Sequence, residues 1–266
     1  MTDPAKSSNW DDLRPRMITG AVMIAVGVVG IWLGGAPFAI GVAVITALMV
    51  WELSRMVAPD KTAEAMQLAV MTAAALLMAR ALPGAYLGAL MLLPALVGAY
   101  LLRAHVAIFI LFSLGIIIAG FGLTLFRDIY GVVWLFWLVI VVASTDIAGY
   151  FGGKLIGGRK FWPTISPKKT WSGILSGWAA AAVIGVIFLM ITDAGRDLIW
   201  ISVLLSFASQ MGDIAESAVK RRMGVKDSSN LLPGHGGLFD RFDGLLGAAL
   251  FMLLVALVVD VPELRF

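Results

Sequence analysis

The chain has 266 residues, of which 60% are hydrophobic and only 14% are charged, and its formal net charge is +3. Ordinary soluble domains carry about 25% charged residues, so the composition excludes a typical soluble protein. The absence of cysteine excludes disulfides and cysteine-based metal sites. We expect a membrane protein, and nothing in the charge balance indicates a nucleic-acid partner.

Long apolar segments follow one another along the chain, and several approach or exceed the ~18–20 residues that cross a bilayer as a helix. Residues 17–51 carry no charge, and Gly34-Gly35-Ala36-Pro37 divides them into two spans. The other segments lie at about 65–82, 84–102, 104–126, 129–148, 171–192, 197–213 and 244–260. They lack both the polar face of a soluble helix and the alternation of a β-barrel strand. We predict an all-α polytopic membrane protein with about nine transmembrane helices.

The distribution of Lys and Arg predicts the orientation of these spans. With nine spans, sixteen basic residues fall at the N-terminus and in the even-numbered connections, and four fall on the other side: Arg80, Arg127, Arg196 and Arg265. Basic residues accumulate on the cytoplasmic side of membrane proteins. We therefore expect the N-terminus and the polar loops 149–170 and 218–243 in the cytoplasm, with the C-terminus outside.

The two halves of the chain differ in their polar content. Residues 1–266 are expected to form one membrane-embedded domain, in which about 17–128 is mainly scaffold, because its loops are short and carry few polar groups. The half at about 129–260 contains both long polar loops. We expect a polar, cytoplasm-facing cavity there and call this the catalytic half.

The loop after the sixth span combines glycines with basic residues. Asp146 ends the span, Gly152, Gly153, Gly157 and Gly158 permit close backbone approach to a ligand, and Lys168 and Lys169 are donors for phosphate. An ordinary cytoplasmic loop with glycine turns explains the same pattern. An acid near a span end is costly unless it faces protein or water, which favours a functional Asp146 over an interfacial residue or a helix cap.

The eighth span carries a polar face. Residues at spacings of three and four share one side of a helix: Ser206, Ser209, Gln210, Asp213, Glu216, Ser217 and Lys220. This face lines a cavity or forms a buried polar seam between helices. Asp240 and Asp243 lie three residues apart at the start of the ninth span and are expected to meet Asp213. Three hard oxygen donors suit Mg²⁺, together with a substrate phosphate.

The connection before the ninth span contains His235, Gly236 and Gly237. The two glycines allow the backbone to contact a phosphate or to close a tight turn. His235 is a weaker candidate for acid–base chemistry. We place all three residues in the expected substrate-binding region.

Four groups of residues together resemble the signature of the phosphatidate cytidylyltransferases, also called CDP-diacylglycerol synthases: Ser217-Ala-Val-Lys220-Arg221, Lys226-Asp227, Leu232-Pro233-Gly234-His235-Gly236-Gly237 and Asp240-Arg241-Phe242-Asp243. The segments around Asp146, Lys168-Lys169 and Gln210–Ser217 are also similar to that family. The resemblance implies that CTP and phosphatidate react to give CDP-diacylglycerol and pyrophosphate. It also implies a homodimer in the bacterial cytoplasmic (inner) membrane, dependent on Mg²⁺ and with room for a second cation such as K⁺.

The resemblance and the helical spacing both assign Asp213, Asp240 and Asp243 to the metal. Lys220, Arg221, Lys226 and Arg241 are expected to hold substrate phosphates, with Lys168 and Lys169 from the other loop, while Asp227 and Asp146 orient their neighbours. Catalysis of attack by one anion on another requires charge neutralisation and positioning more than a protein nucleophile.

Two other functions stay open at this point. A CTP-dependent lipid-alcohol kinase of the dolichol or phytol type resembles this family in its membrane core, and it would transfer the γ-phosphoryl group. A transporter also has many spans and intramembrane acids, but it usually shows related halves and broken spans near the midplane. The long polar block at 217–243 favours the cytidylyltransferase.

Overall fold

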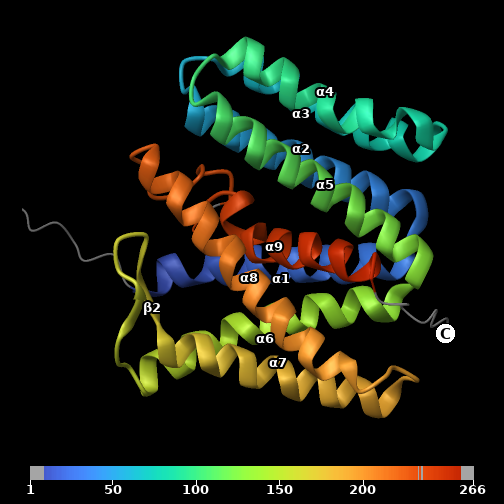
Figure 1. Cartoon of the computed structure of the whole chain (residues 1–266). Helices are drawn as coiled ribbons and strands as arrows, with labels where there is room; N and C mark the ends of the chain where they lie inside the picture. Colours follow the sequence, from blue (N-terminus) through green and yellow to red (C-terminus); the bar gives the residue numbers. More distant parts are fainter. Residues whose placement is uncertain (1–8, 233, 235, 259–266) are drawn as a thin grey trace, which may run out of the picture.

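The structure is a computed structural model that describes residues 9–232, 234 and 236–258 (Figure 1). The elements in this part of the chain are α1 (Asn9–Leu33), α2 (Gly35–Val57), α3 (Thr62–Ala81), η1 (Gly84–Tyr86), α4 (Leu87–Leu102), α5 (Val106–Tyr130), α6 (Val132–Leu155), β1 (Lys160–Trp162), β2 (Ser166–Thr170), α7 (Trp171–Ile191), α8 (Asp197–Arg222) and α9 (Phe239–Ala256). The nine α-helices in this part of the chain correspond one to one with the nine predicted spans. The prediction of an all-α polytopic membrane protein is confirmed.

Seven helical segments in the described ranges are long and apolar enough to cross a membrane: α2, α3, η1 together with α4, and α5 to α8. In α1 the apolar segment is shorter and covers Met17–Leu33. The 18 residues of α9 include three charged side chains near its start, those of Asp240, Arg241 and Asp243. Crossing of the membrane by α1 and α9 therefore stays a prediction.

The predicted break between the first two spans is a single residue. Gly34 has φ of 60°, a left-handed conformation that glycine adopts without strain, and α2 begins at the next residue. Pro37 lies in the first turn of α2, where the missing N–H removes no helical hydrogen bond.

The loop 149–170 is more ordered than predicted. α6 continues to Leu155, and β1 and β2 then form an antiparallel hairpin with Lys160 opposite Thr170 and Trp162 opposite Ser166. Thr170 begins α7 by accepting a hydrogen bond from the Gly173 N–H, as expected of a threonine N-cap. The hairpin therefore leads directly into the next membrane helix.

The helices form two packed groups that α9 connects (Figure 1). One apolar core is built mainly from α2 to α5, and it includes Leu238 and Phe239 at the start of α9. The other core is built mainly from α6, α7 and α8, and it includes Ala248 and Met252 from the later part of α9. The orientation of α9 is thus set at both of its ends.

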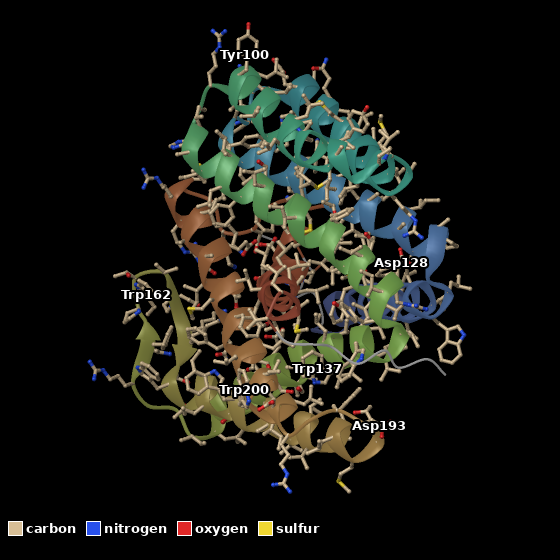
Figure 2. The ribbon with its side chains drawn as sticks, turned by 45° about the vertical axis from the view of Figure 1, so that its right-hand side comes forward. Tyr100, Asp128, Trp137, Trp162, Asp193 and Trp200 are labelled. Atoms are coloured by element: carbon tan, nitrogen blue, oxygen red, sulfur yellow. The ribbon has the colours of Figure 1, made fainter. Side chains whose placement is uncertain are left out.

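The polar connections lie at two opposite ends of the helices. Trp162 of the hairpin lies at one end, and Asp128 and Asp193 lie at the other (Figure 2). The hairpin, the end of α8 and the start of α9 lie at the same end of the bundle (Figure 1). The segments that carry most of the predicted site residues therefore lie at one end of the bundle.

Candidate active site

Three carboxylates from α8 and α9 converge. One oxygen from each of Asp213, Glu216 and Asp243 can be chosen so that all lie within 4.8 Å of one another. Asp213 and Glu216 share a helix face because they are three residues apart. Asp213 and Asp243 meet as predicted, and Glu216 is the third member of the group.

Close contact between two glycines explains how α8 and α9 bring these acids together. Gly212 precedes Asp213, and its Cα lies 3.0 Å from the position that a Cβ on Gly247 would occupy. A side chain on Gly212 would collide with the Asp243 carbonyl oxygen. Small residues permit such close packing of membrane helices, where a larger residue would hold them apart.

Lys169 connects the hairpin to this acidic group. Its Nζ lies 2.5 Å from Asp213 Oδ2 and donates to the Gln210 carbonyl oxygen at 3.3 Å. The charge of Asp146, near the cytoplasmic end predicted for α6, interacts with those of Asp213, Lys169 and Arg241. The hairpin and α8 thus meet at Asp213.

Lys220 lies between the acidic group and α9. Its Nζ is 2.5 Å from Glu216 Oε2 and 2.6 Å from Asp240 Oδ1. The Glu216 side chain is 1% exposed, and its oxygens have no hydrogen-bond partner of good geometry among the described residues. A buried carboxylate without such a partner is costly. Lys220 offsets part of the Glu216 charge through Oε2, and a further cation beside the carboxylate would offset more of it.

Asp240 has a different environment from the three converging acids. Besides Lys220, its carboxylate accepts hydrogen bonds from the backbone N–H groups of Ser228 at 2.9 Å and Gly237 at 2.8 Å. The Ser228 hydroxyl also lies 3.0 Å from Asp240 Oδ2. Asp240 therefore organises the loop before α9, and the Gly237 N–H that was expected to contact phosphate is already bonded.

The remaining predicted site residues surround this centre. Four of the predicted cations have exposed side chains: Arg221, Lys226 and Arg241 on or near α8 and α9, and Lys168 on β2. The Asp227 side chain is also exposed. The Gly236 carbonyl oxygen accepts a hydrogen bond from the Leu232 N–H at 2.8 Å, which closes the turn. His235 lies outside the described residues. The exposed ammonium groups of Lys168 and Lys226 are donors that suit an anionic substrate.

The polar face of α8 divides into two parts. Toward its start, Ser206 accepts a hydrogen bond from Thr145 at 2.8 Å, and Gln210 bonds Trp178 at 3.0 Å and the Ile174 carbonyl oxygen at 3.3 Å. This part is a buried seam with α6 and α7. From Asp213 onward the face belongs to the candidate site. The buried seam and the functional face that the sequence predicted as alternatives are therefore found on different turns of one helix.

A divalent cation fits the donor set of the converging acids. Carboxylate oxygens from two helices face one another, and those of Glu216 are buried without a well-aligned donor. Mg²⁺ binds through carboxylate oxygens and keeps several waters. Like charges held this close also repel unless a cation lies between or beside them.

Comparison with known proteins identifies the family. The chain matches the Cytidylyltransferase family over residues 14–259. The chain belongs to this family. It is 45% identical over 156 residues to the phosphatidate cytidylyltransferase of Brucella suis biovar 1 (strain 1330), a match that covers 56% of this chain and 58% of the relative.

Two further relatives, also named phosphatidate cytidylyltransferase, match shorter segments. The protein of Bacillus subtilis (strain 168) is 46% identical over 122 residues, which cover 45% of each chain. That of Helicobacter pylori (strain ATCC 700392 / 26695) is 42% identical over 123 residues, which cover 46% of each chain. The matches thus span about half the length of these curated relatives.

One buried acid of this cytidylyltransferase-family chain was missed by the sequence analysis. Glu52 lies near the end of α2, in the half assigned mainly to scaffold, and hydrogen-bonds the loop before α9 and the first residues of α9. The available signal was a single acid directly after the uncharged residues 17–51. Burying an acid at that position in a membrane helix costs free energy unless protein groups hydrogen-bond to it.

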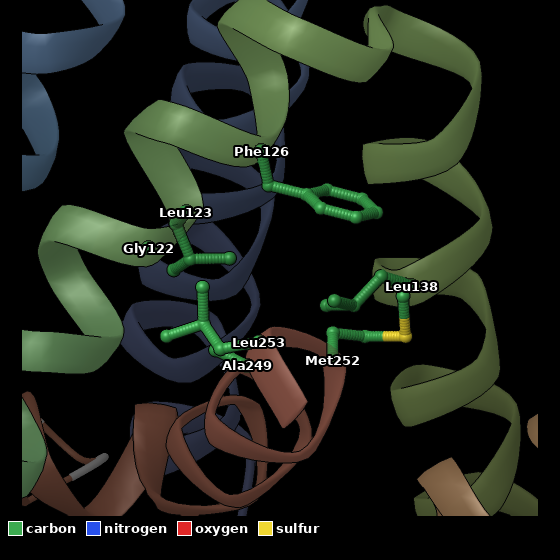
Figure 3. Close-up of a pocket in the computed structure, with 7 residues that line it drawn as sticks. All are labelled: Gly122, Leu123, Phe126, Leu138, Ala249, Met252 and Leu253. Atoms are coloured by element: carbon green, nitrogen blue, oxygen red, sulfur yellow. The ribbon is translucent and has the colours of Figure 1, made fainter. Parts of the chain in front are cut away.

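A separate apolar gap lies between α5, α6 and α9 (Figure 3). It is lined by Gly122, Leu123, Phe126, Leu138, Ala249, Met252 and Leu253. These side chains offer no group for acid–base, metal or phosphate chemistry. This gap is therefore distinct from the carboxylate group of α8 and α9.

Proposed function

We propose that the chain transfers the cytidylyl group of CTP to phosphatidate, giving CDP-diacylglycerol and pyrophosphate. The observation that carries the proposal is the convergence of Asp213, Glu216 and Asp243 beside Lys169 and Lys220. Membership of the family and the names of the relatives support the same reaction.

The reaction needs charge control more than a protein nucleophile. A phosphate oxygen of phosphatidate bonds to the α-phosphorus of CTP, the bond from that phosphorus to the bridging oxygen breaks, and pyrophosphate leaves with the electron pair. Both reactants are anions, so they must be held close while their repulsion is offset. The acids and bases of this site can do both tasks.

The metal ligands are proposed as Asp213 and Asp243 with one further acid. Glu216 is the third acid by position, and Asp240 is the third acid predicted from the sequence. A bound Mg²⁺ would supply positive charge to the phosphate oxygens of CTP. A second cation such as K⁺ is part of the proposal as well.

The basic residues are proposed to bind the two substrates. Lys220 lies within the site, and Arg221, Lys226 and Arg241 lie around it with exposed side chains. Lys168 and Lys169 approach from the hairpin. Asp146, Asp227, His235, Gly236 and Gly237 complete the proposed binding region, in which the two acids orient their neighbours.

The membrane setting is also proposed in detail. We place the chain in the bacterial cytoplasmic membrane as a homodimer, with the N-terminus and the site on the cytoplasmic side and the C-terminus outside. This orientation gives the site access to CTP from the cytoplasm. It follows from the excess of basic residues in the connections on that side.

A labelling experiment tests the reaction. Purified protein in detergent is given phosphatidate, Mg²⁺ and CTP that carries its label on either the α- or the γ-phosphorus. We expect the α-label to enter lipid and the γ-label to leave in pyrophosphate. Entry of the γ-label into lipid would instead establish a kinase, and an unlabelled lipid fraction from folded protein would refute both reactions.

A further inference from the structure

Glu52 is a fully buried acid outside the proposed catalytic group. Its side chain is on α2, its exposed fraction is 0%, and its partners are 176 to 187 residues away in the sequence. A carboxylate is rarely fully buried unless hydrogen-bond donors surround it. Its partners therefore indicate what the residue does.

Four donors surround the Glu52 carboxylate. Oε1 accepts from the Ser229 hydroxyl at 2.5 Å and from the Leu238 N–H at 2.9 Å. Oε2 accepts from the Phe239 N–H at 2.6 Å and lies 3.3 Å from the Ser228 hydroxyl. Hydrogen bonds that involve an ionised group are roughly twice as strong as neutral ones.

The position of Glu52 makes it the cap of α9. The first N–H groups of a helix have no partner within the helix and carry partial positive charge. Here the Glu52 carboxylate of α2 accepts hydrogen bonds from the N–H groups of Leu238 and Phe239. A cap usually comes instead from a residue directly before the helix. The start of α9 is therefore already occupied by an acid and is not left for a substrate phosphate.

Ser228 and Gly237 connect this cap to the proposed active site. The Ser228 hydroxyl lies between Glu52 and Asp240, and its single hydrogen can serve only one of them at a time. A side chain on Gly237 would collide with the Ser228 hydroxyl and with Glu52 Oε1. A shift of Glu52 would thus be passed directly to Asp240, and through α9 to Asp243.

We propose that Glu52 is a positioning residue for the transfer reaction. It holds the turn at Ser228 and Ser229 and the first turn of α9, so that Asp240 faces Lys220 and Asp243 faces Asp213. The inference rests on the proposed function for the role of the site. The physical part, the positioning of α9 from α2, can be tested without substrate or metal.

The test uses the full-length protein in lipid nanodiscs with Glu52→Gln, which keeps the size of the side chain but turns two acceptor positions into donors. Hydrogen exchange is followed by mass spectrometry without substrate or metal. We expect peptides from 226–240 to exchange at least about tenfold faster, while peptides from α5 are unchanged, because only local opening becomes easier. Glu52→Asp keeps the charge and should restore part of the protection.

Steady-state kinetics provide the second readout. Glu52→Gln should lower kcat by about tenfold or more and change the KM for CTP by less than about threefold, since the carboxylates act mainly in the transition state. Ser54→Ala is the matched control, because Ser54 is also buried on α2 but its hydroxyl donates to the Val50 carbonyl oxygen of the same helix at 2.7 Å. It should resemble the wild type in both measurements.

Several results would overturn the inference. Unchanged exchange at 226–240 with unchanged kcat would leave Glu52 without a positioning role. Faster exchange throughout the protein would make it a general contributor to stability. If Glu52→Gln does not fold, Ser229→Ala removes only one donor, and normal exchange of 226–240 in that variant would refute the proposal. A wild type that transfers no α-label would refute the proposed function, while the exchange experiment would still decide the role of Glu52.

Discussion

The third acid of the metal site can be identified by comparing Glu216→Gln with Asp240→Asn. Glu216 lies in the converging group, whereas Asp240 accepts two backbone N–H groups and pairs with Lys220. We expect Glu216→Gln to raise the Mg²⁺ concentration needed for half-maximal activity. Asp240→Asn should lower activity at every Mg²⁺ concentration and change that requirement less, because it disturbs the loop.

The size of the Glu216 effect follows from the charges around it. Two unit charges about 4 Å apart interact by roughly 4 kcal/mol at an effective dielectric constant of about 20, and a divalent ion doubles that value. Lys220, at 2.5 Å, already offsets much of the Glu216 charge, and Mg²⁺ keeps part of its water. A net loss of about 1.4 to 2.8 kcal/mol remains, which corresponds to a roughly tenfold to hundredfold higher Mg²⁺ requirement.

Initial rates of α-label transfer across a wide range of Mg²⁺ concentrations measure this effect. Both substrates are kept saturating, so that the half-maximal Mg²⁺ concentration reports on the metal alone. The assignment of Glu216 as the third ligand is refuted if Glu216→Gln has the wild-type half-maximal Mg²⁺ concentration while Asp240→Asn requires much more Mg²⁺. Asp240 would then be the third ligand, as the sequence predicted, and Glu216 only the partner of Lys220.

Four further predictions follow from the same geometry. Asp213→Asn should lower turnover at least ~100-fold, and the control variant Asp193→Asn should stay near wild type. If Asp213→Asn keeps more than about a tenth of the wild-type turnover, the metal assignment is wrong. Lys169→Met removes the ion pair with Asp213 and should lower kcat/KM by about tenfold in steady-state assays; an unchanged value would exclude the hairpin from the site. Gly237→Ala should destabilise the protein by about 1–3 kcal/mol in denaturant unfolding, because its methyl group would collide with buried oxygens, and normal stability would count against this packing. Cysteines introduced at Lys160 and Asp193 should react from opposite sides of the membrane, and labelling from one side would refute the topology.

The helices were predictable because each of them depends on local sequence. Long apolar segments, the glycine at position 34 and the polar residues between spans mark the elements without reference to packing. The meeting of Asp213 with Asp243 was also predictable, since Asp213 ends one predicted apolar span and Asp243 directly precedes another on the same predicted side. These features need only spacing and the alternation of spans.

The features that were missed depend on contacts between distant residues. The hairpin strands are short and polar, so they lack the apolar alternation that indicates a strand. Glu52 has partners more than 170 residues away, which no local pattern reveals. The choice between Glu216 and Asp240 depends on how α9 is rotated against α8, and that rotation is set where Gly212 and Gly247 touch.

The charge balance of the site explains why its parts come from separate segments. Asp213 is paired by Lys169 from the hairpin, whereas Glu216 and Asp240 share Lys220. Acids held this close on one helix would repel, and at the end of a membrane helix little water is available to reduce the repulsion. Bringing lysines from two directions offsets that repulsion while leaving room between the acids for a further cation. Because α9 is capped from α2 as well, a substitution in any of these four segments should act on the same group of carboxylates.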